Sequence, residues 1–136
     1  PATFQIDDCS TQRNLDDRGR DQARQLGRDL RASNIRFARV YSSQWCRCLE
    51  SATIMDMGAV TALPGLNSFY QGIVPRGPTL AALTDVLESL PDDGGLTLMV
   101  THFVTISAIT GFAIGSGEAV AYDPVNNTAV KIDYNR

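Results

Sequence analysis

The pattern of apolar and polar positions along the chain predicts four helices. Residues 44–57 and residues 104–114 repeat apolar side chains at steps of three and four. Thr79 is a suitable N-cap for a further helix that runs to Leu90. Between residues 16 and 31 small and apolar side chains share one face and charges fill the other, as in an amphipathic helix. These positions are Gly19, Ala23, Leu26, Gly27 and Leu30.

Short β-branched and aromatic runs between these helices predict strands. Residues 37–42 (FARVYS) and 96–100 (LTLMV) are the clearest, and the continuous apolarity of the second is typical of a strand buried on both faces. Residues 60–63 predict a short strand, whereas 119–122 and 128–132 flank a turn as in a hairpin. Strands that alternate with helices predict a three-layer α/β fold, with a mostly parallel sheet and helices on both of its faces.

Length and composition predict a single domain over residues 1–136, because 43% of the side chains are apolar and 20% are charged. Within it, residues 64–78 hold three prolines and three glycines and predict an ordered loop or a small lid. The longest weakly polar stretch, residues 96–114, is interrupted by threonine, serine and histidine. We therefore expect no membrane span.

The net charge of −3 and the pI near 5 argue against a nucleic-acid partner, since a polyphosphate backbone requires a basic field. Eight of the twelve basic residues nevertheless lie between Arg13 and Arg39. They form either a solvated helix face or part of the rim of an anion site. Three cysteines do not make a disulfide scaffold, and Cys46 and Cys48 have the wrong spacing for a zinc clamp, so we expect no metal.

Two predicted strand ends carry residues suited to chemistry. Residues 41–47 end a strand in hydroxyls and place Arg47 in the first turns of a helix, and residues 100–102 bring His102, the only histidine, to the start of another. Ligands of open parallel sheets bind beyond the carboxyl ends of strands, where helix N-termini favour anions. A surface salt bridge would explain Arg47 alone and a structural role would explain His102 alone. Together they predict an anion site, because guanidinium and imidazole both suit phosphate.

Three motifs resemble the histidine phosphatase superfamily, branch 1, whose fold is that of phosphoglycerate mutase. Residues 41–52 are similar to its signature, in which a strand ends in Ser-Ser and a helix carries Arg and then Glu-Thr-Ala. Residues 96–111 resemble its second histidine motif, and residues 14–27 resemble its Leu-x-x-x-Gly-x-x-Gln-Ala helix. The motifs occur in the family's order and cover most of the chain.

The resemblance implies a phosphatase that acts on a phosphorylated small molecule or a phosphoprotein, through a phosphohistidine intermediate and without a cofactor. Arg47 and His102 would take the catalytic roles of the family's second arginine and second histidine. A mutase is less favoured, because mutases rely on a longer insertion with carboxylates. The residues expected to bind substrate are Arg13, Ser43, Asn67 and Ser68, although Asn67 and Ser68 also suit a purely structural loop.

The family's nucleophile is a histidine in an Arg-His-Gly or Arg-His-Ala tripeptide on the first strand, and this chain contains no Arg-His pair. We expect that strand upstream of Pro1, and His102 is not taken as its replacement. Residues 64–78 hold no carboxylate, so the leaving group needs no strong acid or receives one such as Asp85 or Glu88; we assign none. The alternatives are a noncatalytic module that binds phosphorylated ligands and a purely structural domain.

Cys9 and Cys46 both flank the expected site. A disulfide between them would suit a periplasmic or secreted protein, and two free buried thiols are the alternative. Pro1 is not an initiator methionine, so the start of the chain assigns no compartment. On the cysteines, a periplasmic or secreted location is favoured over the cytoplasm.

Overall fold

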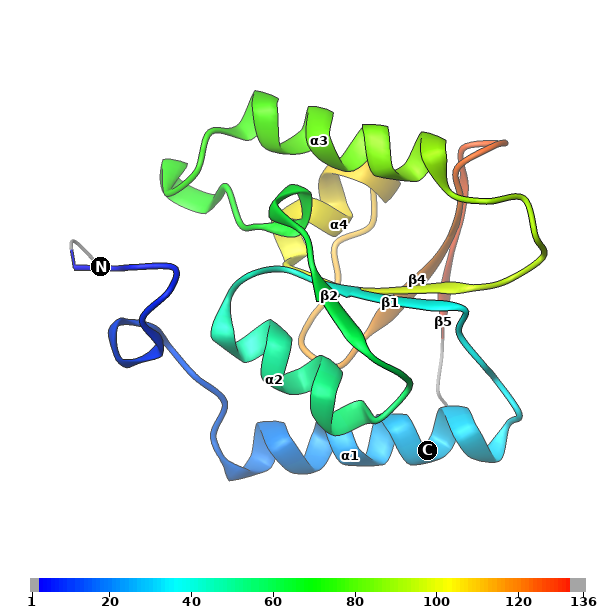
Figure 1. Ribbon diagram of the computed structural model, residues 1–136, viewed down its shortest axis with the longest axis horizontal. Coiled ribbons are helices and arrows are strands. Elements are labelled where there is room, and N and C mark those ends of the chain that lie inside the picture. Colours follow the sequence, from blue (N-terminus) through cyan, green and yellow to red (C-terminus); the bar gives the residue numbers. More distant parts are fainter. Residues whose placement is uncertain (1–2, 133–136) are drawn as a thin grey trace.

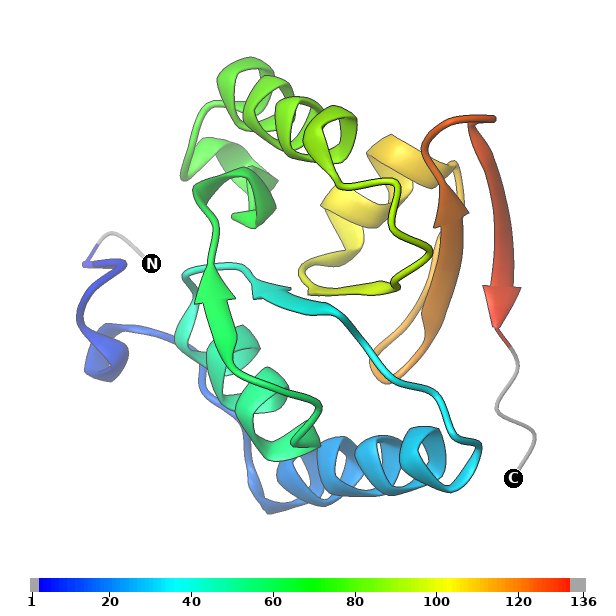
Figure 2. The same ribbon diagram turned by 45° about the vertical axis from the view of Figure 1, so that its right-hand side comes forward.

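A computed structural model describes residues 3–132, which form a three-layer α/β fold (Figures 1 and 2). The central sheet is parallel and has the order β2-β1-β3. Its middle strand, β1 (Arg39–Ser42), pairs with β2 (Val60–Ala62) on one side and with β3 (Thr97–Val100) on the other. Helices α1 and α2 cover one face of the sheet, and α3 and α4 cover the other. The predicted fold class is confirmed.

The helix boundaries follow from local chemistry. Helix α1 spans Asp17–Ala32, and the carboxylate of Asp16 accepts the Gly19 N–H as an N-cap. Helix α4 spans Phe103–Thr110 and ends there because Gly111 adopts φ 79°, a left-handed conformation that glycine tolerates. The prediction that this helix continues to residue 114 is therefore wrong.

The other two helices are α2 (Cys46–Met55) and α3 (Arg76–Ser89). Helix α3 begins three residues before the predicted cap, Thr79, whose hydroxyl donates to the Pro75 carbonyl. Thr79 is thus an interior residue of the first turns rather than the cap.

Helix α1 packs against α2 at a point where the sequence has a glycine. A Cβ atom on Gly27 would overlap the backbone carbonyl of Met55, so the two helices approach closely only because residue 27 has no side chain. The Arg31 guanidinium donates to the carbonyls of Met55 and Asp56, at the end of α2. The small residues on the predicted helical face thus set the distance between the two helices.

Strand β3 is less buried than its apolar sequence predicts. All four of its residues are partly exposed, because β1 pairs with it on one edge only. The predicted hairpin is confirmed, with β4 (Ala119–Asp123) antiparallel to β5 (Thr128–Ile132). This hairpin forms a separate two-stranded sheet and does not extend the parallel one.

Two irregular segments border the carboxyl end of the sheet. Before α1, the chain forms a short 3-10 turn, η1 (Cys9–Thr11). The proposed lid, residues 64–78, contains two more, η2 (Pro64–Leu66) and η3 (Tyr70–Gly72), before α3 begins; its role as a lid stays a prediction. Within residues 3–132 no helix has the length and apolarity needed to cross a membrane.

Candidate phosphate-binding site

The predicted anion site forms where β1 and β3 end side by side. Ser42 pairs with Val100, and the Ser43 N–H donates to the Val100 carbonyl at 2.9 Å, so both chains leave the sheet at the same place. Arg47 is the second residue of α2, and His102 is the N-cap of α4. Nη2 of Arg47 lies 3.2 Å from Nδ1 of His102. The two residues predicted for this site therefore meet.

A buried chain of polar groups continues behind His102. Its Nε2 lies 2.8 Å from Oγ of Ser43, which lies 3.2 Å from Oδ1 of Asn67. The same Asn67 oxygen accepts the Gln44 N–H at 2.8 Å, and the Trp45 N–H donates to Oγ of Ser43 at 3.1 Å. Asn67 thus links the loop after β2 to the strand end after β1.

His102 is buried, with 5% of its surface exposed. The edge of the Trp45 ring packs against it, with centroids 5.1 Å apart, and Sγ of Cys48 lies 3.7 Å from Nε2. Burial, and then the charge of Arg47, lower the pKa of His102 from 6.5 to about 3. Burial also raises the pKa of Cys48 to about 11. Both side chains are neutral at neutral pH.

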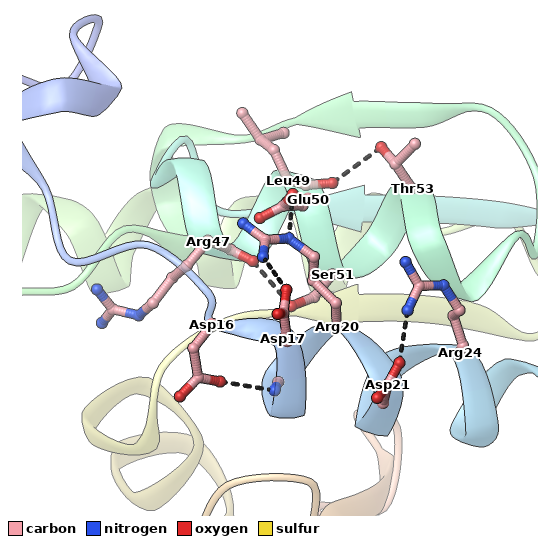
Figure 3. A network of polar contacts seen from close by, with 11 residues as sticks. Asp16, Asp17, Arg20, Asp21, Arg24, Arg47, Leu49, Glu50, Ser51 and Thr53 are labelled. Atoms are coloured by element: carbon pink, nitrogen blue, oxygen red, sulfur yellow. Dashed lines mark hydrogen bonds and ion pairs between the residues drawn. The ribbon is translucent and has the colours of Figure 1, made fainter.

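The charge of Arg47 is available for an anion. Within the described residues no carboxylate pairs with its guanidinium, which points away from the acidic groups on α1 and α2 (Figure 3). Glu50, one turn along α2, is instead paired with Arg20 at 3.1 Å, and Arg20 also contacts Asp17. On α1, Arg20 and Arg24 form ion pairs with acidic side chains, whereas Arg31 donates to carbonyls at the end of α2. A part for the basic residues in the rim of an anion site stays a prediction.

The structure separates the four predicted substrate-binding residues. Ser43 and Asn67 belong to the polar chain behind His102, and both are buried. Ser68 is also buried, and its hydroxyl accepts the Tyr70 N–H in the same loop. Arg13 is exposed in the segment before α1. None of the described contacts joins Ser68 or Arg13 to the Arg47–His102 pair, and substrate binding by all four residues stays a prediction.

Three further side chains make contacts around the site that the sequence did not predict. Cys48 contacts His102 from α2, and Gln44 fixes the amide of Asn67 by accepting from its Nδ2 at 2.8 Å. Gln12 caps α2, because its side-chain oxygen accepts the Cys46 N–H at 2.9 Å. No local sequence pattern indicated these contacts, because each of the three joins segments far apart in the chain.

Cys9 and Cys46 form a disulfide, with Cα atoms 5.7 Å apart. Of the two alternatives left open by the sequence, the structure has the bonded one. Together with the Gln12 cap, this bond fixes the segment before α1 to the start of the helix that carries Arg47.

Other chemistry near the site is sparse. Asp85 and Glu88 are exposed on α3, and no contact within residues 3–132 connects either carboxylate to Arg47 or His102. The described residues contain no cluster of three or more His, Cys, Asp or Glu side chains suited to a metal ion. The buried hydroxyl of Thr105, in the first turn of α4, has no hydrogen-bond partner in the described part of the chain.

Comparison with known proteins agrees with this geometry. The family model of the histidine phosphatase superfamily (branch 1) matches residues 8–74, the region that carries the Ser-Ser strand end and Arg47. Residues 8–74 of this chain are thus similar to this superfamily. No curated protein matches its sequence.

Two solved structures share the histidine phosphatase fold with this chain. The protein histidine phosphatase SixA, complexed with tungstate, has a TM-score of 0.64 at 16% identity, over 96% of this chain and 86% of its own. A phosphoglycerate mutase from Plasmodium falciparum has a TM-score of 0.59 at 15% identity, over 88% of this chain and 84% of its own. At these identities the likeness establishes the phosphoglycerate mutase-like fold.

Proposed function

We propose that this protein hydrolyses phosphomonoesters or phosphohistidine through a phosphohistidine intermediate. The contact between Arg47 and His102 carries the proposal, because it brings an imidazole together with a guanidinium that has no carboxylate partner within residues 3–132, at the carboxyl end of the sheet. The match of residues 8–74 to the superfamily's model supports phosphatase or mutase-like activity in general. The name of SixA, a protein histidine phosphatase, favours hydrolysis and a phosphorylated protein as substrate; a phosphorylated small molecule stays the alternative.

The nucleophile of this reaction would be a histidine upstream of Pro1. The unpaired edge of β3 supports a place for it, since a further parallel strand added there would end beside His102. The partial exposure of the apolar strand β3 is consistent with such a neighbour. The protein's activity would then belong to the longer chain.

The chemistry assigned to the described residues is electrostatic. The upstream imidazole nitrogen would form a bond to phosphorus while the bond from phosphorus to the leaving oxygen or nitrogen breaks. The leaving atom takes a proton from solvent, and water then attacks the phosphohistidine to release phosphate. Arg47 would donate to the phosphoryl oxygens throughout, stabilising charge that is greatest in the transition state.

The competing function is a module that binds a phosphorylated ligand without turnover. The absence of an Arg-His pair from the chain favours it, because Arg47 and His102 bind an anion without a nucleophile. A purely structural domain would not explain why the charge of Arg47 has no carboxylate partner in the described part of the chain.

Hydrolysis of p-nitrophenyl phosphate by the longer protein separates these functions. We expect activity that is lost when the upstream histidine is replaced by alanine and that falls about 100-fold or more in Arg47→Ala. Arg24→Ala is the matched control, because Arg24 lies on the solvated face of α1 and pairs with Asp21. Phosphate binding without turnover would establish the module, and an upstream segment without the Arg-His pair would refute the enzyme.

A further inference from the structure

The donor at one end of the polar chain determines the direction of every hydrogen bond in it. A guanidinium has only N–H donors, so Nδ1 of His102 must accept from Arg47. A neutral imidazole carries one proton, which therefore lies on Nε2 and is donated to Ser43. The Ser43 hydroxyl must then donate to Oδ1 of Asn67, and Gln44 holds this oxygen in place through its backbone N–H.

Burial makes this arrangement costly to change. Ser43 is fully buried and Asn67 is 4% exposed, so neither hydroxyl nor amide has water as an alternative partner. In the opposite tautomer, the proton on Nδ1 of His102 would face the N–H donors of Arg47. Nε2 would then need to accept from the Ser43 hydroxyl, whose one proton is already donated to Asn67. Unsatisfied polar groups at buried positions cost about 1–3 kcal/mol each.

An anion bound to Arg47 lies next to the unprotonated Nδ1 of His102. An oxygen that accepts from Nη2 lies close to Nδ1, because the two nitrogens are 3.2 Å apart. Both the oxygen and Nδ1 then present lone pairs, which repel unless a proton lies between them. The proton comes either with the ligand, as the P–O–H of a phosphate monoanion, or from solvent onto Nδ1.

We propose that Ser43 and Asn67 are positioning residues that hold His102 as the Nε2–H tautomer, so that the site binds a phosphate group together with one proton. The proposal deepens the proposed function and rests on it, since it specifies the protonation state of the bound phosphate. The site discriminates between oxyanions by whether they carry a proton, in addition to their size and charge.

Two titratable side chains face the imidazole, Arg47 and Cys48, and both belong to α2. The end of β1 contributes Ser43 and Trp45, and β3 leads into His102 through Thr101; none of these three ionises in the working range. Within residues 3–132 no carboxylate hydrogen-bonds or pairs with His102. The proton taken up together with the anion therefore lies between Nδ1 of His102 and an oxygen of that anion.

The tautomer is measurable directly in the longer protein, with the His102 signals identified as those that disappear in His102→Asn; within residues 1–136 His102 is the only histidine. In 15N NMR of the unliganded chain we expect a protonated Nε2, an unprotonated Nδ1 and no titration between about pH 5 and about pH 8. A protonated Nδ1, or titration within this range, would overturn the proposal.

Variants of two adjacent serines test the positioning role. Ser43→Ala removes the acceptor of the Nε2 proton, and we expect the His102 nitrogen signals to shift or broaden through tautomer exchange. Ser42→Ala is the control, because Ser42 is equally buried but donates to the Ser43 carbonyl and does not contact His102. Unchanged His102 signals in Ser43→Ala would contradict the role; if this variant does not fold, the unmodified chain still decides the tautomer.

Anion titrations test the proton. With inorganic phosphate we expect affinity to fall about tenfold per pH unit above its second pKa, the slope for one linked proton. Sulfate, which has the same shape but carries no proton near neutral pH, should bind at least about tenfold more weakly than phosphate at about pH 6. Equal, pH-independent binding of both anions would overturn this proposal alone, whereas binding of neither would overturn the proposed function as well.

Discussion

At the scale of single residues, His102 combines a buried position with a cationic neighbour. An imidazole is normally half protonated at pH 6.5, but burial among Trp45, Cys48 and Ser43 removes the water that would solvate its charge, and Arg47 repels that charge. His102, which the sequence predicts as part of an anion site, is thus held in its neutral form. The same burial makes it a determinant of stability.

We expect His102 to make the protein acid-sensitive. Its pKa is 6.5 unfolded and about 3 folded, so between these values the unfolded chain binds the additional proton. The contribution of neutral His102 is therefore complete above about pH 6.5 and falls by about 1.4 kcal/mol per pH unit as the pH decreases. Urea unfolding at several pH values measures it.

His102→Asn is the control for this prediction. The pKa values of three carboxylates are also lowered, so protonation of these groups in acid destabilises the fold as well: Asp93, Glu118 and Asp123. This effect is the same in the unmodified protein and in His102→Asn. The difference between the two curves isolates the histidine. Parallel curves below pH 6.5 would show that His102 is protonated in the folded state.

The buried hydroxyl of Thr105 is expected to lower the stability of the protein. Its hydroxyl is buried without a partner in the described chain, and valine has nearly the same shape without the polar atom. We expect Thr105→Val to raise the free energy of unfolding by about 1 kcal/mol. Thr110→Val in the same helix should lower it, because the Thr110 hydroxyl donates to Ile106 and accepts from Phe112. A loss of stability in both variants would mean that Thr105 has a partner.

At the scale of elements, the contact between α1 and α2 positions Arg47. The sequence predicts the small face of α1, but not that Gly27 meets the backbone at the end of α2. Helix α2 is also fixed at its start, by Gln12 and by the disulfide to Cys46. The guanidinium is thus carried by a helix held at both ends.

Gly27→Ala should destabilise the protein by about 2–3 kcal/mol, because the new Cβ atom would overlap the Met55 backbone and force the helices apart. Gly77→Ala is the matched change, since a Cβ atom at this exposed position in α3 meets nothing within 4 Å. It should stabilise by about 0.5 kcal/mol through the unfolded chain. Thermal unfolding of both variants measures these changes. Equal changes in stability would contradict the close approach of α1 to α2 at Gly27.

At the scale of the whole molecule, the Cys9–Cys46 bond joins the segment before α1 to the start of α2. It closes a loop with a sequence separation of 37 residues. Reduction should therefore lower the free energy of unfolding by about 2–4 kcal/mol.

Urea unfolding with and without reductant measures this contribution. The double variant Cys9→Ser with Cys46→Ser should match the reduced protein and respond no further to reductant, since Cys48 is the remaining cysteine and is free. Equal stability of the oxidised and reduced protein would show that the bond does not constrain the unfolded chain.

The sequence by itself determined the order and type of the main elements, the α/β class and the two strand ends that carry Arg47 and His102. These follow from local periodicity and from the rule that parallel strands end at one edge. The tertiary structure alone decided what surrounds those residues: Asn67 behind Ser43, Cys48 against the imidazole, and the unpaired edge of β3. The physical reason is that these hydrogen bonds, and the burial of these side chains, join groups far apart in the chain. The periodicity of a sequence reports only on residues that are close along it.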